Sequence, residues 1–294
     1  MSKFRYLIDP DVAPREGGFA AVYRSVREHD GEVRALKLLR NDQDPEHLAR
    51  FQDEARIQGQ LHHPYIVGVD DSHFVPGQTF LAMEFVDGGT LRDLMNAGMN
   101  DESKIFAISY IADAVAYAHE FGVIHRDLKP ENVLYDRVRR IVKVSDFGVA
   151  RQGGFSLGLT RGFIGTPDYA APEQKASGHA DERSDIFSLG VMVHEMFFGE
   201  MPRFNEDGCL LKWETFDKTP DGFRDIVISM LAHNPDHRYQ SIRDFQIDFQ
   251  TCVERSEICS VLAPSKLEKV VKVVGFGLLI AALAAGVIAL ARKK

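Results

Sequence analysis

The first part of the chain, up to about residue 85, consists of short apolar runs separated by turn residues. Residues 19–26 (FAAVYRSV) and 32–39 (EVRALKLL) are rich in residue types that favour β-strands. The turn-prone sequence His-Asp-Gly at 29–31 lies between them. This pattern predicts two neighbouring strands within a strand-rich segment over about 4–85.

Apolar residues at helical spacing occur once in this segment and dominate from residue 91 onward. Residues 45–61 follow that spacing, with Asp44 as a candidate N-cap and Pro45 at the first helical position. Later helices are predicted over 103–121, 185–198, 222–232 and 241–253. The expected architecture is therefore of the α+β class, with a small β-rich lobe followed by a larger α-helical lobe.

The last apolar run differs from the others in its length. Residues 273–291 carry no charge and no side-chain amide, and as a helix they would span about 28 Å, close to the thickness of a bilayer's hydrocarbon core. Basic residues flank the run on both sides, at Lys266, Lys269, Lys272 and 292–294. We predict one transmembrane helix over 273–291, joined to the helical lobe by a linker over 251–272. A buried core helix is the alternative, which the lack of any polar face disfavours.

Small residues recur every four positions along this predicted membrane helix. They are Gly277, Ala281, Ala285 and Ala289. Such rows let two membrane helices approach closely and pair. A homodimer through this face is therefore an expectation, and the alternative is that Gly and Ala are simply common in membrane helices.

Composition and charge narrow the class of protein. The 294 residues are 45% apolar and 27% charged, which is ordinary for a globular protein and excludes a disordered chain. A formal net charge of −8 argues against a nucleic-acid partner held by phosphate neutralisation. From residue 264 on, six Lys or Arg and one Glu give a net charge of +5, so the preceding residues carry −13. Three cysteines without a C-x-x-C pair, and an N-terminus without an apolar signal stretch, favour a reducing, cytosolic environment.

Three motifs in the helical part carry residue types that phosphoryl transfer requires. They are HRDLKPEN at 125–132, DFG at 146–148 and APE at 171–173. The reaction needs a carboxylate base, oxygen ligands for a metal and a cation that neutralises phosphate, and all of these occur here in order. The motifs and their spacing resemble the eukaryotic-type protein kinase family, in particular its bacterial eukaryotic-like serine/threonine members, over about residues 4–250.

The resemblance implies a bilobal protein-kinase-like fold, with an N-lobe over about 4–85 and a C-lobe over about 86–250. It also implies that the protein binds ATP and Mg²⁺ and acts on protein substrates.

The same resemblance assigns roles to individual residues. Asp127 would be the catalytic base, and Lys129 would neutralise the γ-phosphate during transfer. Asn132 and Asp146 would hold the magnesium ions. Lys37 would hold the α- and β-phosphates, with a glutamate seventeen residues on, Glu54, as its ion-pair partner.

The loop that would cover the phosphates departs from the family. The pattern G-x-G-x-x-G-x-V begins at Arg15, so only its middle glycine, Gly17, is kept, and Ala20 stands in the last glycine position. For Arg15 we weigh two alternatives, an outward-pointing surface cation and a direct contact to nucleotide phosphate. The departure affects nucleotide affinity above all, because glycine lets backbone N–H groups approach phosphate closely.

Other residues are expected to line the nucleotide pocket. They are Gly18, Val22, Ala35, Met83, Glu84 and Val86. Met83 would limit the back of the adenine pocket, and residues 84–86 would form the connector whose backbone binds adenine. Ordinary strand core is the alternative for Met83, and the two roles are compatible.

The acceptor side is similar to that of kinases that phosphorylate Ser and Thr. The resemblance rests on Lys129 and on the sequence Gly-Thr-Pro-Asp-Tyr, whose Thr166 would contact the base and the acceptor. Ser156 and Thr160 are candidate phosphorylation sites that could pair with Arg126. The alternative is that these two hydroxyls are simply solvated.

Two further matches imply structural roles. Glu173 and Arg238 would form a buried ion pair, and Asp185 would brace the backbone of the catalytic loop.

The sequence thus predicts a single-pass serine/threonine protein kinase of the cell membrane, with a cytoplasmic kinase domain that also phosphorylates itself. Only three residues follow the predicted span, so it is expected to be a tail anchor. The flanking cations do not determine the orientation of the span, since three lie on each side. We infer the orientation from the kinase domain instead, which has to lie on the cytoplasmic side, where ATP is available. One alternative is a membrane-anchored pseudokinase scaffold, suggested by the departed glycine loop. The other is a small-molecule phosphotransferase, which the APE segment argues against.

Overall fold

The computed structural model describes residues 5–17, 19–75, 77–147, 151–152, 166–211 and 222–255. The predicted membrane segment, 273–291, lies outside these ranges, as do Gly18, Ser156 and Thr160. Within the described part of the chain, no helix is both long enough and apolar enough to cross a membrane.

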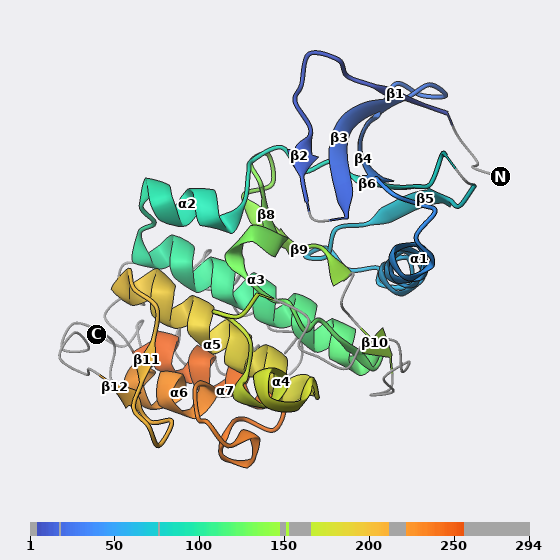
Figure 1. Cartoon of the computed structure of the whole chain (residues 1–294). Helices are drawn as coiled ribbons and strands as arrows, with labels where there is room; N and C mark the ends of the chain where they lie inside the picture. The colour runs from blue at the N-terminus through green and yellow to red at the C-terminus, as the bar shows by residue number, and fades with distance from the viewer. Residues whose placement is uncertain are drawn as a thin grey trace, which may run out of the picture.

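A β-sheet lobe is followed by a helical lobe, as the sequence predicts (Figure 1). The sheet is antiparallel, with strand order β1-β3-β4-β6-β5 and with β2 paired to β3. Its strands are β1 (Tyr6–Ile8), β2 (Arg15–Glu16), β3 (Ala20–Arg27), β4 (Val33–Leu39), β5 (Val69–His73) and β6 (Phe80–Glu84). The strands predicted over 19–26 and 32–39 are confirmed as β3 and β4, which pair along their length.

One helix, α1 (Pro45–Gln58), packs beside β4 and β5. Its start is as predicted, because the Asp44 carboxylate accepts hydrogen bonds from the first free N–H groups of the helix. Its end comes three residues before the predicted Leu61. Gly59 follows the last helical residue, and glycine is a poor helix former.

The helical lobe is built around α3 (Asp101–Glu120) and α5 (Glu182–Phe198), which pack against each other (Figure 1). Both helices are buried over most of their surface in one apolar core. Within the residues that the structure describes here, four shorter helices accompany them, namely α2 (Leu91–Ala97), α4 (Pro172–Ser177), α6 (Phe223–Met230) and α7 (Ile242–Arg255). The four helices predicted in this lobe are therefore confirmed as α3, α5, α6 and α7.

The starts of α3 and α5 lie two and three residues before the predicted positions 103 and 185. Polar caps set these starts. Asn100 accepts a hydrogen bond from the N–H of Ser103, and Asp181 accepts one from the N–H of Arg183. Because the caps precede the first apolar position of each helix, apolar spacing alone places the starts too late.

Short strand pairs hold the segments that carry the chemical motifs. β8 (Val133–Asp136) pairs with β9 (Ile141–Val144), and β7 (Val123–Ile124) pairs with β10 (Arg151–Gln152). HRDLKPEN therefore lies between β7 and β8, and Asp146 lies just after β9. A separate hairpin joins β11 (Arg203–Phe204) to β12 (Leu210–Leu211).

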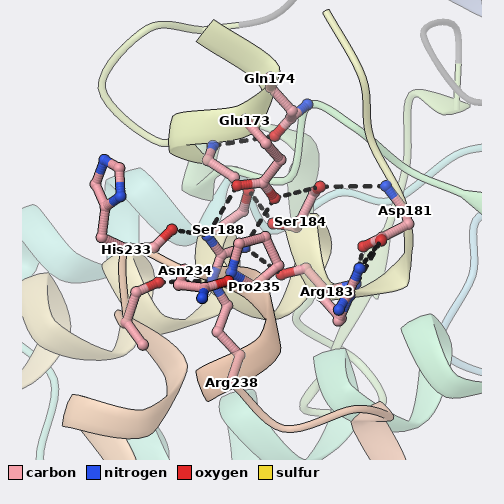
Figure 2. Close-up of polar contacts among 12 residues, drawn as sticks. Glu173, Gln174, Asp181, Arg183, Ser184, Ser188, His233, Asn234, Pro235 and Arg238 are labelled. Carbon is pink, nitrogen blue, oxygen red and sulfur yellow. Dashed lines mark hydrogen bonds and ion pairs between the residues drawn. The ribbon is translucent and has the colours of Figure 1, made fainter. Parts of the chain in front are cut away.

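The predicted ion pair between Glu173 and Arg238 is confirmed, and it anchors α4 to the rest of the helical lobe (Figure 2). Two guanidinium nitrogens of Arg238 each donate to a different carboxylate oxygen of Glu173 at 2.8 Å. The Arg238 side chain is fully buried, and its remaining donors are used on backbone carbonyls, including those of Ala232 and Arg183. Ser184 donates a further hydrogen bond to Glu173 at 2.7 Å. This network fixes the end of the segment that precedes α4.

Candidate active site

The segment 125–132, called the catalytic loop below, is held at its start by Asp185 on α5, as predicted. Its buried carboxylate accepts the N–H groups of His125 at 2.8 Å and Arg126 at 2.9 Å, and it lies 2.8 Å from Nε2 of His119. Burial raises the pKa of Asp185, but its hydrogen bonds and the nearby histidines lower that pKa by more, so the group stays ionised. Arg126 has a φ of 69°, a costly conformation for a residue other than glycine, and Asp185 stabilises it.

Two predicted side chains, those of Lys129 and Asn132, and one backbone N–H, that of Thr166, converge on the carboxylate of Asp127. Nζ of Lys129 lies 2.7 Å from its Oδ2, and Nδ2 of Asn132 donates to the same oxygen at 3.2 Å. The N–H of Thr166 donates to Oδ1 at 2.8 Å. Lys129 also donates to the hydroxyl of Thr166 at 2.5 Å. The carboxylate is thus oriented on both oxygens, and a cation and a hydroxyl lie beside it.

A second cluster joins the two lobes around Lys37. Its Nζ lies 2.5 Å from Oε1 of Glu54 on α1 and 2.6 Å from Oδ1 of Asp146 after β9. Burial lowers the pKa of Lys37, but the two carboxylates raise it above its ordinary value overall, so the lysine is charged. The Lys37 ammonium lowers the pKa of Asp146. Burial and the Asp146 carboxylate raise the pKa of Glu54 to about 7, against the opposing effect of Lys37.

The position of Asp146 is set by its backbone and by the residue that follows it. Asp146 has a φ of 67°, again a conformation that L-residues rarely adopt. Phe147 is fully buried, and its ring lies 4.7 Å from that of His125. His125 also approaches the carbonyl of Ser145 at 3.0 Å. The catalytic loop therefore holds the segment around Asp146 in place.

The oxygens of Asn132 and Asp146 fit a magnesium site. Magnesium prefers oxygen ligands and is usually held by one or two side chains together with substrate phosphates. Asn132 uses its amide nitrogen toward Asp127, which leaves its amide oxygen for a metal. The Asp146 side chain is 47% exposed although one of its oxygens contacts Lys37. Among the described residues, no three His, Cys, Asp or Glu form a group that could hold a metal ion.

The residues predicted to surround adenine come together on three neighbouring strands. Val22 on β3 is paired with Lys37 on β4, and Ala35 on β4 is paired with Met83 on β6. Met83 is buried in the core of the β-sheet lobe, and Val86 packs against the same core. The prediction that Met83 is part of the strand core is therefore confirmed, and its second role, as a wall of the adenine pocket, stays a prediction.

Glu84 binds the helical lobe through its side chain. Its carboxylate lies 2.7 Å from Nζ of Lys143 and 3.2 Å from Nη1 of Arg139. The side chain of Glu84 is thus engaged by the helical lobe, and its backbone N–H donates to the carbonyl of Gly68 at 2.9 Å. Adenine binding by the backbone of this connector stays a prediction.

The loop that would cover the phosphates is fixed at several points. Glu16 forms an ion pair with Arg40, and the N–H of Gly17 donates to the carbonyl of Ala20 at 3.0 Å. The ring of Phe19 lies 4.2 Å from that of His47 at the start of α1. Side-chain contacts thus hold a loop that has lost two of the three glycines of its family pattern.

Arg15 makes a contact that neither sequence alternative includes. Its Nη2 lies 3.5 Å from Oδ2 of Asp93 on α2, in the other lobe. Sequence reasoning missed Asp93. A signal for it was present, because Thr90 and Asp93 have the spacing of a capping box at the start of α2, and the structure contains that box.

Comparison with known proteins gives one matching family and many relatives. The family model described as "Protein kinase domain" matches residues 16–249. A probable serine/threonine-protein kinase of Streptomyces coelicolor is 32% identical over 281 residues, which cover 88% of this chain and 41% of that protein. The serine/threonine-protein kinase PknB of Mycolicibacterium smegmatis is 35% identical over 257 residues, which cover 79% of this chain and 40% of that protein.

A third relative is matched over a larger share of its length. The serine/threonine-protein kinase PknL of Mycobacterium tuberculosis is 31% identical over 277 residues, covering 89% of this chain and 69% of that protein. The chain otherwise spans only about two fifths of the length of the relatives that it matches.

Proposed function

The chain belongs to the protein kinase family, within the serine/threonine class that its relatives represent, and we propose that it is a membrane-anchored serine/threonine protein kinase. It transfers the γ-phosphate of ATP to Ser and Thr hydroxyls of proteins, including its own chain. The observation that carries this proposal is the carboxylate of Asp127, held by Lys129, Asn132 and Thr166.

The positions of these groups support a transfer step like that of the protein kinase family. The oxygen of an acceptor hydroxyl forms a bond to the γ-phosphorus, the bond from that phosphorus to the β–γ bridging oxygen breaks, and ADP leaves. Asp127 orients the hydroxyl and accepts its proton. Lys129 lies 2.7 Å from that carboxylate, where it neutralises charge on the transferred group.

The other half of the site binds the nucleotide. Lys37 holds the α- and β-phosphates, and Glu54 keeps the lysine charged and oriented. Asn132 and Asp146 would hold magnesium through their side-chain oxygens. When bound, magnesium neutralises phosphate charge and orients the γ-phosphate.

The proposed acceptor class rests on the contact between Lys129 and Thr166. The hydroxyl of Thr166 receives the Lys129 hydrogen bond at 2.5 Å while its N–H donates to the base. These contacts support the proposal, because the resemblance to serine/threonine kinases predicts that Thr166 contacts both the base and the acceptor.

The membrane part of the proposal rests on the sequence of 273–291 and its flanking cations. It places the kinase domain on the cytoplasmic side, where ATP is available. Pairing of two such helices would raise the effective concentration of one kinase domain for the other and so favour autophosphorylation in trans. Ser156 and Thr160 are the proposed acceptor sites within the chain.

The test is transfer of labelled γ-phosphate by the full chain in lipid nanodiscs, with ATP, magnesium and a mixture of protein substrates. Asp127→Asn is the matched variant, because it keeps the shape of the side chain and removes its charge. Label on Ser or Thr that is lost in this variant is the expected result. A folded wild-type chain that binds ATP and transfers no label would instead support the pseudokinase scaffold.

Membrane attachment is tested separately by fractionation of cells that express the chain. The full chain is expected with the membranes, and a chain without 273–291 is expected in the soluble fraction. Equal distribution of the two would contradict the anchor and leave the kinase proposal intact.

A further inference from the structure

A polar cluster around Arg92 lies beside the acceptor side of the site, and the transfer step does not use it. Arg92 on α2 donates from Nε to Glu131 at 2.7 Å and from Nη1 to Glu195 at 2.6 Å. Its Nη2 donates to the second oxygen of Glu195 at 3.2 Å and to the hydroxyl of Tyr169. Tyr169 in turn donates to Glu195 at 2.5 Å. The side chains of Arg92 and Glu195 are only 25% and 14% exposed.

Two short stretches of chain connect this cluster with the groups that hold the base. Glu131 lies two residues after Lys129. Tyr169 lies three residues after Thr166, in a turn closed by a hydrogen bond from its N–H to the Thr166 carbonyl at 3.2 Å. Two residues of extended chain reach about 7 Å. Because Lys129 and Thr166 both contact Asp127, a peptide whose hydroxyl lies at Asp127 is expected to bring a side chain two or three positions away close to the cluster.

The charges of the cluster explain what such a side chain would meet. Two carboxylates, Glu131 and Glu195, would together attract a basic side chain of the acceptor, since arginine binds carboxylates through its planar fork. Arg92 already makes this two-point contact with Glu195 and a further one with Glu131. The chain thus supplies internally the guanidinium that a basic acceptor would otherwise supply.

We propose that Arg92 determines acceptor specificity, because it occupies the acidic pair Glu131–Glu195 and so admits acceptors without a basic residue near the phosphorylated hydroxyl. The proposal rests on the proposed kinase function. Arg92 acts through the two carboxylates and is a positioning residue, not a catalytic one. Its removal uncovers a site for a basic side chain, and removal of Glu131 weakens that attraction further.

The surroundings of Arg92 indicate a suitable variant. A cavity of about 130 Å³ borders Arg92 and Glu195 and is lined partly by Met95, Met99 and Met196. Methionine is flexible and fills irregular apolar space well. Arg92→Met therefore removes the charge and keeps a side chain that can lie among these methionines.

The test compares kcat/KM of the full chain in detergent for two sets of Ser peptides. The sets are identical except for Arg or Ala at positions two and three residues from the acceptor, on either side of it. The wild type is expected to favour the Arg peptides by no more than about twofold. Arg92→Met is expected to raise that ratio by about fivefold to tenfold, because it frees the part-buried Glu195 carboxylate to pair with the peptide arginine.

Three further variants make the result specific. Arg92→Lys keeps the charge and loses the two-point contact, so its ratio is expected to lie between those of the wild type and Arg92→Met. Glu131→Gln, at a side chain that is 45% exposed, is expected to lower the ratio below that of the wild type, and it tests the proposal even where Arg92→Met does not fold. Arg137→Met removes an arginine that pairs with Asp87 outside this cluster, and it is expected to leave the ratio unchanged.

Different outcomes separate the two proposals. Ratios that are the same in the wild type and in the Arg92→Met and Glu131→Gln variants, each of them active, overturn the role of Arg92. A wild type that already favours Arg peptides more than tenfold overturns it too. A folded wild type that binds ATP and phosphorylates no peptide and no protein contradicts the kinase function, and the inference falls with it.

Discussion

Nη2 of Arg15 on β2 lies 3.5 Å from Oδ2 of Asp93 on α2, so an ion pair connects the phosphate-covering loop with the helical lobe. The Asp93 carboxylate is held in place within the helical lobe, because its Oδ2 accepts hydrogen bonds from the N–H of Thr90 at 2.7 Å and from the Thr90 hydroxyl at 2.6 Å. Arg15 is paired with Val22 in the sheet, next to the expected adenine position. We therefore expect this contact to slow the release of a nucleotide that binds beneath the loop.

Arg15→Gln is expected to speed nucleotide dissociation by about twofold to fivefold at low salt. Both side chains of the pair are more than half exposed, so the ion pair is weak and is screened by salt. The measurement is the dissociation rate of a fluorescent ADP analogue at low and high ionic strength, and the difference between the wild type and the variant should disappear at high salt. Arg5→Gln, which removes a cation paired with Glu28, is the matched control. A difference that does not depend on salt would rule out this explanation.

Glu54→Gln is expected to change how stability depends on pH. The pKa of Glu54 is raised in the folded state to about 7, above its unfolded value of about 4.5. Its favourable contribution is therefore fully present below pH 4.5 and is lost as the pH rises through about 7. Relative to the variant, the nucleotide-free wild type should lose unfolding free energy over this range, measured by urea unfolding. Parallel pH profiles for the two chains would contradict the raised pKa.

Thr166→Ala is expected to lower kcat for peptide acceptors by about tenfold, with little change in KM for ATP. The substitution removes the hydroxyl that receives the Lys129 hydrogen bond, but the backbone N–H that donates to Asp127 remains, so the loss is partial. Steady-state kinetics with one Ser peptide measure both constants. Thr166→Ser keeps the hydroxyl and should restore most of the rate; equal defects in the two variants would show that the methyl group matters instead.

Arg238→Met is expected to lower the unfolding free energy by about 3 to 5 kcal/mol, because it leaves the Glu173 carboxylate without its buried partner. Chemical unfolding measures the change. The double variant with Glu173→Gln should recover a large part of the loss, since it also removes the stranded charge. Arg137→Met breaks an exposed ion pair with Asp87 and should cost less than about 1 kcal/mol. Similar losses in both single variants would show that burial does not govern the effect.

Acid should weaken the same ion pair. Burial raises the pKa of Glu173, but Arg238 and the other hydrogen-bond donors lower it below its ordinary value overall. The stabilising contribution is present above the unfolded pKa and is lost as the pH falls through the lower folded value. The destabilisation caused by Arg238→Met should therefore shrink under strongly acidic conditions, as followed by urea unfolding at several pH values.

The sequence predicts those parts of the site whose residues lie in short, fixed motifs. One six-residue segment contains Asp127, Lys129 and Asn132, so its local backbone conformation determines how these side chains lie relative to one another. Lys37 and Asp146 are 109 residues apart and were predicted only through resemblance to a family, because no local pattern links them. Apolar spacing likewise predicted the long helices and missed where polar caps begin them.

Two contacts between charged side chains of different elements, Arg15–Asp93 and Arg92–Glu195, could not be predicted from the sequence. Arg15 and Asp93 meet because two lobes pack at one particular angle, and either residue alone reads as an ordinary surface charge. Arg92 and Glu195 are 103 residues apart, and they meet through a side-chain contact between α2 and α5. Neither relation leaves a periodic signal in the sequence.

The two lobes have apolar cores of very different size, and this difference predicts the order in which the site comes apart. The core of the β-sheet lobe contains few buried side chains, whereas the core around α3 and α5 is several times larger and includes Ile57 at the end of α1. Hydrogen exchange should therefore reach β3 and β4 well before α3 and α5. In such a partly open molecule Lys37 would be released from Asp146, while Asp127 and the residues around it would stay assembled, so loss of nucleotide binding would precede loss of the acceptor site.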